Sequence, residues 1–386
     1  MLYYRYRSGS ELAIKELIYD ELYFASREEC NDPYEGKTFA ILEKDQDLWN
    51  NLIRLALKFY ANDLTEYLIK RIIAFYFDKA PIYFDQLVNT SEDEFLCIGK
   101  DDLEKRVLKN MLESIKQFAL VYMPSEQYFA SFSRTDDNFL MWSHYANNHR
   151  GFCLVFRSTD GKIQQSRTWK RKQLSYITPH SFSPKMSFAL PDAFEIRDIE
   201  YVETPEYLNG FMCFPAAVAK EKYTQSEIEE FQTKQSKTYW QKHTVWDYEK
   251  ESRAVLSSGI SWLAGERLSI PAHQRLFHYE STQLVGIVLG ARTSKEQRQR
   301  IEQIVAEKVN RWYVNSDGER IISNFVLFEE HLSEANRNVE IVPYKIYGGV
   351  KPVEKNDENF DRLYNNWKEG WALKFVGTGA ERIQLK

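Results

Sequence analysis

The spacing of apolar residues changes along the chain, and the changes predict where strands and helices alternate. Residues 2–7 have a strand-like pattern, residues 11–18 carry apolar positions at helical spacing, and residues 21–25 predict a second strand. Residues 26–36, with Asn-Asp-Pro and a glycine, predict a turn-rich loop. We therefore expect the chain to open with a strand, a short helix, a second strand and a loop.

From residue 47 the pattern becomes helical for a long stretch. Apolar stripes predict helices across residues 47–79 and again across 101–123, where Pro124 ends the last helix. After it, the expected elements are a strand over 128–133, a helix over 138–146 and a buried central strand over 151–156.

The remaining elements are expected further along the chain. Ser226 and Glu229 form a capping-box pattern that predicts a helix continuing to about His243. Strands are expected at 197–202, 251–256, 284–289 and 340–347, with an amphipathic helix at 294–309. Pro343 would confine the strand at 340–347, expected to be the last, to a sheet edge.

Strands and helices are interspersed without regular beta-alpha alternation, so the predicted class is α+β with a mixed sheet. We expect a core of residues 1–46 and 124–350, a helical insertion at 47–123, a basic insertion at 161–196 and a C-terminal tail at 351–386. Between 161 and 190 there are six basic residues and no acid, which predicts an exposed insertion or a solvated loop. Neither a Rossmann fingerprint nor a Walker loop is present.

Composition narrows the classes of function. Aromatic residues make up 15% of the 386 residues, which supplies flat faces for stacking on ligand rings. A net charge of −5 gives no global attraction to nucleic acid or to a membrane, and no run is apolar enough to span a bilayer. We expect a cytoplasmic protein with no membrane partner. The four cysteines form no CxxC pair and the histidines have no ligand spacing, so no metal site is expected.

Two charged clusters coincide with predicted strands. Arg5 and Arg7 share one face of the first strand, where each guanidinium needs an anionic ligand or an ion pair. Glu249, Glu251 and Arg253 would share one face of a later strand, and the two carboxylates repel unless a cation or polar ligand lies between them. A salt-bridge ladder, Glu251 with Arg253 or Glu249 with Arg7, is the structural alternative.

A third cluster combines hydroxyls with rings. Ser131 and Ser133 lie on one predicted strand, and Trp142, His144 and Tyr145 lie on the helix after it. This grouping predicts a ring-binding pocket at the end of the strand. The alternative is that Trp142 and Tyr145 belong to the core and that His144 is structural.

Five sequence blocks resemble a known bacterial family. In order they are YRYRS, ELYFASREECNDPYEG, MWSHYANNHRGFCLVF, WDYEKESRAVL and VGIVLGARTS. They are similar to the signature blocks of the DUF2971 family and span residues 4–294. The name of that family implies no activity.

A more distant resemblance is to the ADP-ribosyltransferase fold, which has a split β-sheet core. That fold carries an Arg or His on its first core strand, then Ser-x-Ser or a Tyr, then a Glu that is often part of Glu-x-Glu. This chain offers, in the same order, Arg7 or Arg5, then Ser131 and Ser133, then Glu249 and Glu251. The opening strand, helix and strand also look like the start of that fold.

The resemblance implies NAD as a substrate and gives each residue a role. Arg7 would hold the pyrophosphate or ribose, and Tyr145 or Trp142 would stack on the nicotinamide ring. Glu251 would stabilise the oxocarbenium-like charge, while Glu249 would orient or deprotonate the acceptor.

The resemblance therefore implies ADP-ribosyl transfer to a protein or nucleic-acid acceptor, or NAD hydrolysis, as in a toxin or phage-defence effector. The competing hypothesis is a non-catalytic module that senses a nucleotide or nucleic acid through aromatic surfaces and the basic insertion. The sequence leaves the oligomeric state open.

Overall fold

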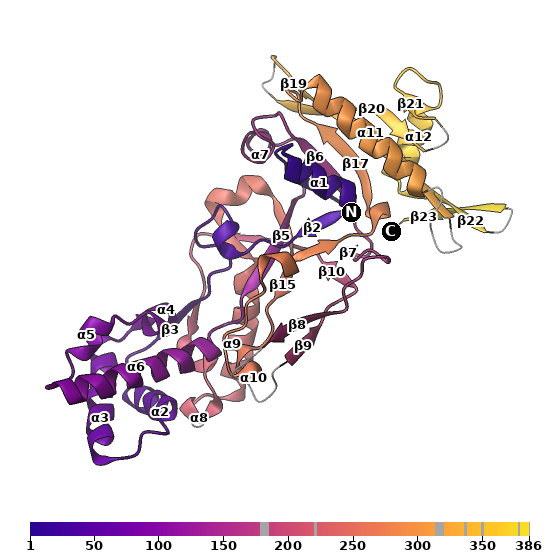
Figure 1. Ribbon diagram of the computed structural model, residues 1–386. Helices are drawn as coiled ribbons and strands as arrows, with labels where there is room; N and C mark the ends of the chain where they lie inside the picture. The colour runs from indigo at the N-terminus through magenta and orange to yellow at the C-terminus, as the bar shows by residue number, and fades with distance from the viewer. Residues whose placement is uncertain are drawn as a thin grey trace.

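A mixed β-sheet forms the centre of the larger lobe in the computed structural model, which describes residues 1–177, 185–219, 222–312, 320–335, 338–348, 351–376 and 379–385 (Figure 1). Within these residues nine strands form the sheet, in the spatial order β11 (Arg197–Asp198), β15 (Glu251–Ser257), β5 (Gln127–Ser133), β1 (Leu2–Arg7), β6 (Phe152–Arg157), β17 (Leu284–Leu289), β19 (Phe325–Leu332), β20 (Val339–Tyr347) and β21 (Val353–Glu354). Neighbouring strands are antiparallel except β17 and β19, which are parallel. The predicted α+β class is confirmed.

Strand alternation sends the side chains of the sheet into two apolar layers. Phe152, Leu154 and Phe156 pack under α1 (Glu11–Tyr19) and α11 (Lys295–Trp312). The alternate residues of β6 face the other side, which α7 (Phe139–Tyr145) and α12 (Phe360–Lys368) cover. The near-continuous apolar run of β6 is thus explained by helices on both faces.

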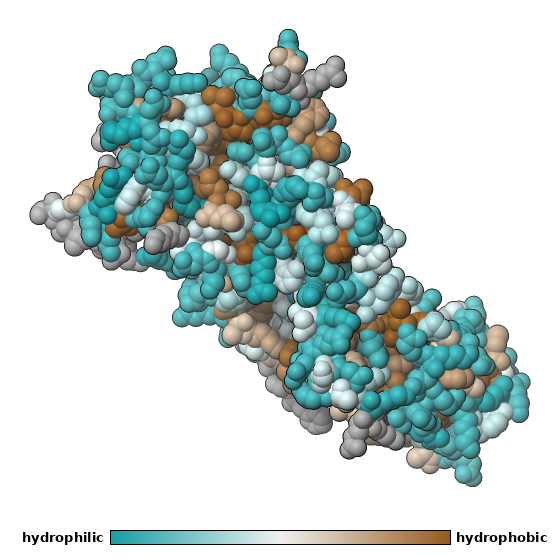
Figure 2. Space-filling model, turned by 180° about the vertical axis from the view of Figure 1, so that it is seen from behind, coloured by the Kyte–Doolittle hydropathy of each residue, from teal (hydrophilic) through white to brown (hydrophobic). Residues whose placement is uncertain are grey.

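The predicted helical stretch at 47–123 builds a separate lobe, seen at the lower left of Figure 1. Its helices are α2 (Gln46–Ala56), α3 (Asp63–Lys79), α4 (Phe84–Val88), α5 (Glu92–Leu96) and α6 (Asp102–Tyr122). Their apolar faces enclose one core together with β3 (Phe39–Leu42) and residues 208–218, which include α8 (Ala216–Ala219). Figure 2 shows both lobes from behind, with hydrophilic residues covering most of that face.

Shorter strands pair outside the central sheet. They are β2 (Glu21–Tyr23) with β16 (Leu276–His278), β3 with β4 (Ile82–Tyr83) and β13 (Tyr207–Asn209), β7 (Lys162–Gln164) with β10 (Ala193–Glu195), β8 (Gln173–Ile177) with β9 (Lys185–Ala189), and β12 (Glu200–Val202) with β14 (Gln241–His243). Two further helices are α9 (Gln225–Lys237) and α10 (Ser261–Ala264).

The basic stretch at 161–196 contributes buried residues to the main core, which was not predicted. Ile163, Leu174 and Phe194 lie buried in the main core, so the expectation of an exposed insertion is wrong for these strands. The strand neighbours of these three residues are exposed or partly exposed, so each strand buries one face and leaves the other nearer to solvent. Residues 178–184 of the stretch lie outside the described residues.

The C-terminal segment, predicted as a tail, contains regular structure. Phe360 and Trp367 of α12 are buried against the sheet. β22 (Trp371–Val376) pairs with β18 (Arg320–Ser323) and β23 (Gly379–Gln384). The strand predicted at 340–347 is β20, which is followed by β21, and Pro343 lies beyond the two residues, Lys345 and Ile346, that pair with β21.

Gly151 sets the approach of β6 to the end of β1. A Cβ atom at this position would lie 2.0 Å from the Arg7 carbonyl oxygen. We expect Gly151→Ala to lower the free energy of unfolding by about 3 kcal/mol, because only a backbone shift can relieve the clash. Urea denaturation measures this loss.

Gly161→Ala is the matched control, since a Cβ there meets nothing within 4 Å although its φ is +71°. It should cost only about 1 kcal/mol, from the left-handed backbone. Equal losses in the two variants would contradict the importance of the close approach at Gly151.

Candidate functional site

β1 and β5 share the shortest pairing in the described central sheet, and a pocket lies where these two strands separate. β1 pairs with β5 at one position, Tyr4 with Ser133, whereas it pairs with β6 along its whole length. The pocket has a volume of about 250 Å³. Seven of the nine predicted site residues line it: Arg5, Arg7, Ser131, Ser133, Tyr145, Glu249 and Glu251.

Glu249 and Glu251 both line the pocket, but they do not lie on one strand as predicted. Glu251 begins β15, but Glu249 ends a 3-10 turn over Thr244–Glu249. Lys250 between them is left-handed, with φ 44° and ψ 47°. The prediction of one strand through all three residues is wrong, because the chain turns at Lys250 and brings Glu249 back beside Glu251.

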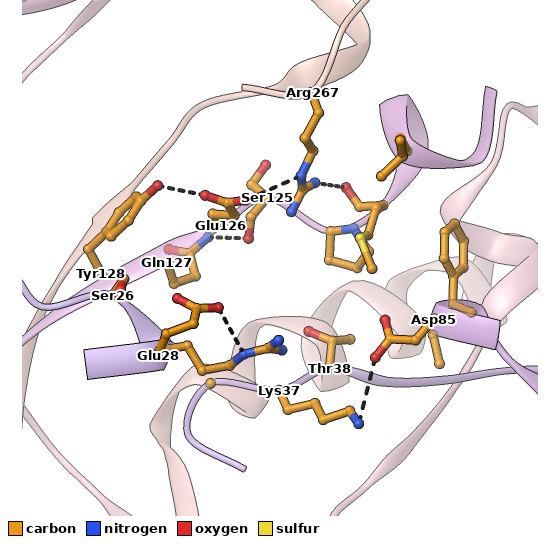
Figure 3. A pocket seen from close by; sticks show the side chains of 17 residues that line it. Ser26, Glu28, Lys37, Thr38, Asp85, Ser125, Glu126, Gln127, Tyr128 and Arg267 are labelled. Atoms are coloured by element: carbon orange, nitrogen blue, oxygen red, sulfur yellow. Dashed lines mark hydrogen bonds and ion pairs between the residues drawn. The ribbon is translucent and has the colours of Figure 1, made fainter. Parts of the chain in front are cut away.

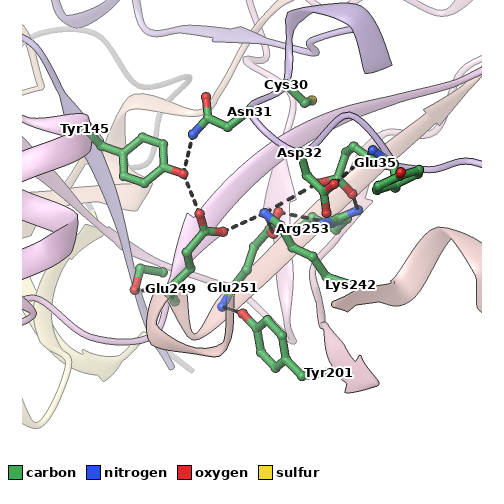
Figure 4. A network of polar contacts seen from close by, with 12 residues as sticks. Cys30, Asn31, Asp32, Glu35, Tyr145, Tyr201, Lys242, Glu249, Glu251 and Arg253 are labelled. Atoms are coloured by element: carbon green, nitrogen blue, oxygen red, sulfur yellow. Dashed lines mark hydrogen bonds and ion pairs between the residues drawn. The ribbon is translucent and has the colours of Figure 1, made fainter. Parts of the chain in front are cut away.

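A buried network of charges holds these carboxylates (Figure 4). Lys242 Nζ lies 2.6 Å from Glu249, 3.1 Å from Glu251 and 3.4 Å from Glu35. The Arg253 guanidinium lies 2.8 Å from Glu251 and 2.5 Å from Glu35. Three carboxylates therefore share two cations, and all five side chains are at most 6% exposed.

The network separates the pKa values of the two pocket carboxyls. Burial raises the pKa of Glu251, but the charges of Arg253 and Lys242 outweigh burial and hold it well below its usual range. Burial raises the pKa of Glu249 above its usual range, although Lys242 acts in the opposite direction. Glu251 is thus a permanent negative charge, whereas Glu249 is closer to exchanging a proton.

The two arginines of β1 have different partners. Arg7 forms an ion pair with Glu16 of α1 at 2.6 Å, which is the predicted structural alternative. Arg5 is 7% exposed, and among the described residues no carboxylate lies within 4 Å of its guanidinium. Its two hydrogen bonds, to the carbonyls of Ser131 and Tyr23, are long at 3.4 and 3.3 Å, and its Nε has no partner.

The pKa of the Arg5 guanidinium reflects its buried position without an ion pair. Burial, with a smaller effect from Arg7, lowers the pKa of Arg5 to about 9, although the charge of Glu16 acts in the opposite direction. A buried cation without a counter-ion is costly, and an anion in the pocket would remove that cost.

The hydroxyl and ring residues divide into two groups. The Ser133 hydroxyl donates to the Glu249 carbonyl at 2.7 Å, and a hydrogen bond from Ser131 helps to lower the pKa of Glu251. The Tyr145 hydroxyl donates to the Glu249 carboxylate and accepts from Asn31 at 2.5 Å. The two serines and Tyr145 therefore orient the acidic wall of the pocket.

Trp142 and His144 do not line the pocket. Trp142 is completely buried, donates to the Asp136 carbonyl and packs edge-on against Tyr6, so it cannot stack on a ligand there. His144 is exposed and contacts the ring of Tyr248. Of the three predicted residues of α7 only Tyr145 lines the pocket, together with Met141 of the same helix, so the prediction is wrong for Trp142 and His144.

Sequence reasoning missed Lys242 and Glu35. Lys242 lay inside the predicted helix to His243, but the cap is Thr224 with Glu227, and α9 ends at Lys237. Lys242 then lies on β14, where strand geometry aims it at Glu249 and Glu251. Glu35 lies in the predicted loop, and a loop gave no signal of an inward side chain.

A separate cavity of about 260 Å³ lies between the lobes, near Thr38 and Gln127 (Figure 3). Its charged side chains pair with one another: Arg267 with Glu126 at 3.7 Å, and Lys37 with Asp85 at 3.6 Å. We consider the β1/β5 pocket the better candidate, because it alone of the two contains the unpaired Arg5.

Two other kinds of feature are absent from the described part of the chain. No group of three or more His, Cys, Asp or Glu side chains in them could hold a metal ion. None of their helices is both long and apolar enough to cross a membrane.

Comparison with known proteins matches part of the chain to one family and gives no activity. Residues 141–254 match the family described as "Protein of unknown function (DUF2971)". The match confirms the predicted family resemblance and covers the third sequence block and most of the fourth. No curated protein and no solved structure matches the chain.

Proposed function

We propose that this protein cleaves NAD at the nicotinamide glycosidic bond, as an ADP-ribosyltransferase or an NAD glycohydrolase. The observation that carries the proposal is the convergence of Arg5, the Ser131/Ser133 strand and the Glu249/Glu251 pair on one pocket. These groups come from β1, β5 and the start of β15, far apart in sequence. The narrow pairing of β1 with β5 also supports the likeness to a split sheet.

The chemistry follows from the two unlike carboxylates. As the bond from the ribose C1′ to the nicotinamide nitrogen breaks, the electron pair leaves with nicotinamide and positive charge develops on the ribose. The fixed charge of Glu251 stabilises that cation. Glu249, with its raised pKa, accepts a proton from the water or acceptor that attacks C1′.

Arg5 supplies the anion-binding element. A guanidinium can bind a diphosphate with two parallel hydrogen bonds, and Arg5 has donors without strong partners. The pocket is near the lower limit of small-molecule sites, about 300 Å³. It therefore accommodates the nicotinamide ribose half of NAD, with the other half lying across the pocket mouth.

The direct experiment incubates the full chain with NAD and follows free nicotinamide by chromatography, with and without protein lysates as acceptors. Nicotinamide with ADP-ribose indicates hydrolysis, and labelled acceptor indicates transfer. No nicotinamide under any of these conditions would refute the proposal. NAD binding without cleavage would favour the sensor alternative for the nucleotide itself.

For a nucleic-acid sensor, the basic stretch offers less free charge than its sequence suggests. Lys170 pairs with Asp192 at 2.6 Å, and Arg167 lies 3.9 Å from Glu280. Arg171 donates to the Gln274 carbonyl and lies over the ring of Phe277. We therefore favour the enzyme.

Arg5→Met distinguishes a ligand-binding arginine from a structural one. If Arg5 awaits an anion, its loss should weaken NAD binding by at least about tenfold, as expected for a charge-assisted hydrogen bond of 1.5–3 kcal/mol. The free protein should keep or gain stability, because a buried unpaired cation is replaced by an apolar chain of similar length. Calorimetric titration and thermal melting measure the two effects.

Arg7→Met is the matched control. It breaks the ion pair with Glu16 and should lower the melting temperature. A loss of stability in Arg5→Met as large as that in Arg7→Met, with NAD binding unchanged, would assign Arg5 to the scaffold.

A further inference from the structure

Outside the pocket, hydrogen bonds join the side chains of Ser143, His149 and Glu330 one after another. Nδ1 of His149 lies 2.6 Å from Oε1 of Glu330, and Nε2 lies 3.2 Å from the Ser143 hydroxyl. The second oxygen of Glu330 accepts the backbone N–H of Ala291 at 2.9 Å. A carboxylate beside Nδ1 keeps a proton on that nitrogen, so Nε2 is free to accept from the serine.

The backbone is bent to bring His149 into this position. Asn147, Asn148 and His149 have φ values of +50°, +53° and +66°, and such left-handed backbone is uncommon for residues other than glycine. The His149 N–H donates to the Trp142 carbonyl, and its own carbonyl accepts from Arg292 at 2.8 Å. Consecutive strained residues of this kind concentrate at functional sites.

The three hydrogen-bonded side chains differ in burial. A nucleophilic serine needs a fixed acid and base and a hydroxyl that a substrate can reach. Glu330 and His149 are 3% and 2% exposed, whereas Ser143 is half-buried. The imidazole is fixed by Phe139, whose ring centroid is 4.8 Å away, and by the parallel ring of Trp142 at 6.5 Å. The imidazole is therefore held between two rings, while Ser143 is partly exposed.

An apolar surface lies beside the hydroxyl. Phe139 is 52% exposed and lies one helical turn before Ser143 on the same face of α7, and Leu140 is 43% exposed. An acyl group or an apolar alcohol can pack on these side chains while its carbonyl carbon faces Ser143.

We propose that Ser143, His149 and Glu330 form a nucleophilic triad that acts on carboxylic esters with an apolar group. The Ser143 oxygen bonds to the carbonyl carbon, and its proton passes to Nε2 of His149. The bond to the leaving alcohol breaks, and His149 returns the proton to that alcohol. Water then attacks the acyl-serine, giving its proton to His149, and the carboxylic acid and free Ser143 are restored.

This activity is independent of NAD cleavage, since none of the three residues lines the β1/β5 pocket. The test uses a fluorophosphonate probe on the full chain. The serine oxygen bonds to phosphorus, fluoride leaves with the P–F electron pair, and the proton goes to His149. We expect a single adduct on the peptide that contains Ser143, located by mass spectrometry.

Two variants and one control make the outcome specific. Ser143→Ala should abolish the adduct, and Glu330→Gln should slow labelling more than tenfold, because an amide no longer fixes the imidazole tautomer. Ser114→Ala removes another half-buried helical serine, which donates to the Asn110 carbonyl and has no histidine partner, and it should be labelled like the wild type.

Circular dichroism confirms that each variant is folded before labelling. An unlabelled wild type, or labelling that survives Ser143→Ala, would overturn the triad. Undiminished labelling in a folded Glu330→Gln variant would also overturn it.

Discussion

Lys242→Met is expected to lower the free energy of unfolding by about 3–5 kcal/mol, because it leaves three buried carboxylates with one cation. Lys242 contacts Glu249, Glu251 and Glu35 within 3.4 Å. Without it, Glu35 and Glu251 would keep Arg253, and Glu249 would lose its ion pair. Urea denaturation followed by circular dichroism measures the loss.

Lys109→Met is the control on the surface. Lys109 pairs with Glu92 at 2.7 Å, close to the shortest Lys242 distance, but its side chain is 62% exposed. We expect a change within about 0.5 kcal/mol, since solvent screens the pair. The double variant Lys242→Met/Glu249→Gln should recover part of the loss, because it removes one surplus carboxylate.

A loss below about 1 kcal/mol in Lys242→Met would show that water reaches the carboxylates and stabilises them. The cluster would then be a hydrated part of the pocket. That result would also remove the physical reason for the low pKa of Glu251.

The sequence predicted the parts of this site that depend on local periodicity. The apolar runs of β6 and β17 identify strands in the centre of the sheet, and alternation places Arg5 with Arg7 and Glu251 with Arg253 on common faces. The Glu251/Arg253 pair, foreseen as a structural alternative, is present at 2.8 Å.

Long-range pairing could not be predicted in the same way. Glu35 meets Arg253 across 218 positions of sequence, and no local pattern encodes that contact. Lys242 was hidden because the predicted helix continued to about His243, whereas α9 ends at Lys237 and Lys242 lies on β14. Trp142 was misplaced because helical spacing tells which residues share a face and not which face meets the sheet.

The same limit applies to the difference between Arg5 and Arg7. Both occupy one strand face, yet only Arg7 lies opposite a carboxylate of α1. The packing of α1 over β1 decides which guanidinium is paired. The unpaired Arg5 is therefore a tertiary feature, although the strand that carries it was predicted.

Glu251→Gln is expected to reduce nicotinamide release by about 100- to 1,000-fold, the range found when one group that stabilises transition-state charge is removed. An amide has nearly the shape of the carboxylate but cannot offset the positive charge that develops on the ribose. The KM for NAD should change little, because the lost interaction strengthens only as the bond breaks.

The variant should stay folded. At present three carboxylates share Lys242 and Arg253, so one amide leaves two carboxylates with two cations. The amide oxygen can still accept from Arg253. A thermal melt checks this before any rate is compared.

Glu104→Gln is the matched control for replacing a buried, paired glutamate. Glu104 is 8% exposed and lies 3.6 Å from Arg71 in the helical lobe, away from the pocket. It should retain the wild-type rate of nicotinamide release. Equal rates in wild type, Glu251→Gln and Glu104→Gln would mean that Glu251 only joins strands.

Glu249→Gln separates transfer from cleavage. Its raised pKa fits proton uptake from the attacking group, and an amide cannot accept that proton. We expect the transfer to an acceptor, or hydrolysis by water, to fall more than nicotinamide departure measured in a single turnover. If both Glu→Gln variants slowed every step equally, the two carboxylates would act as one charge, and the separate roles derived from their unlike pKa values would be wrong.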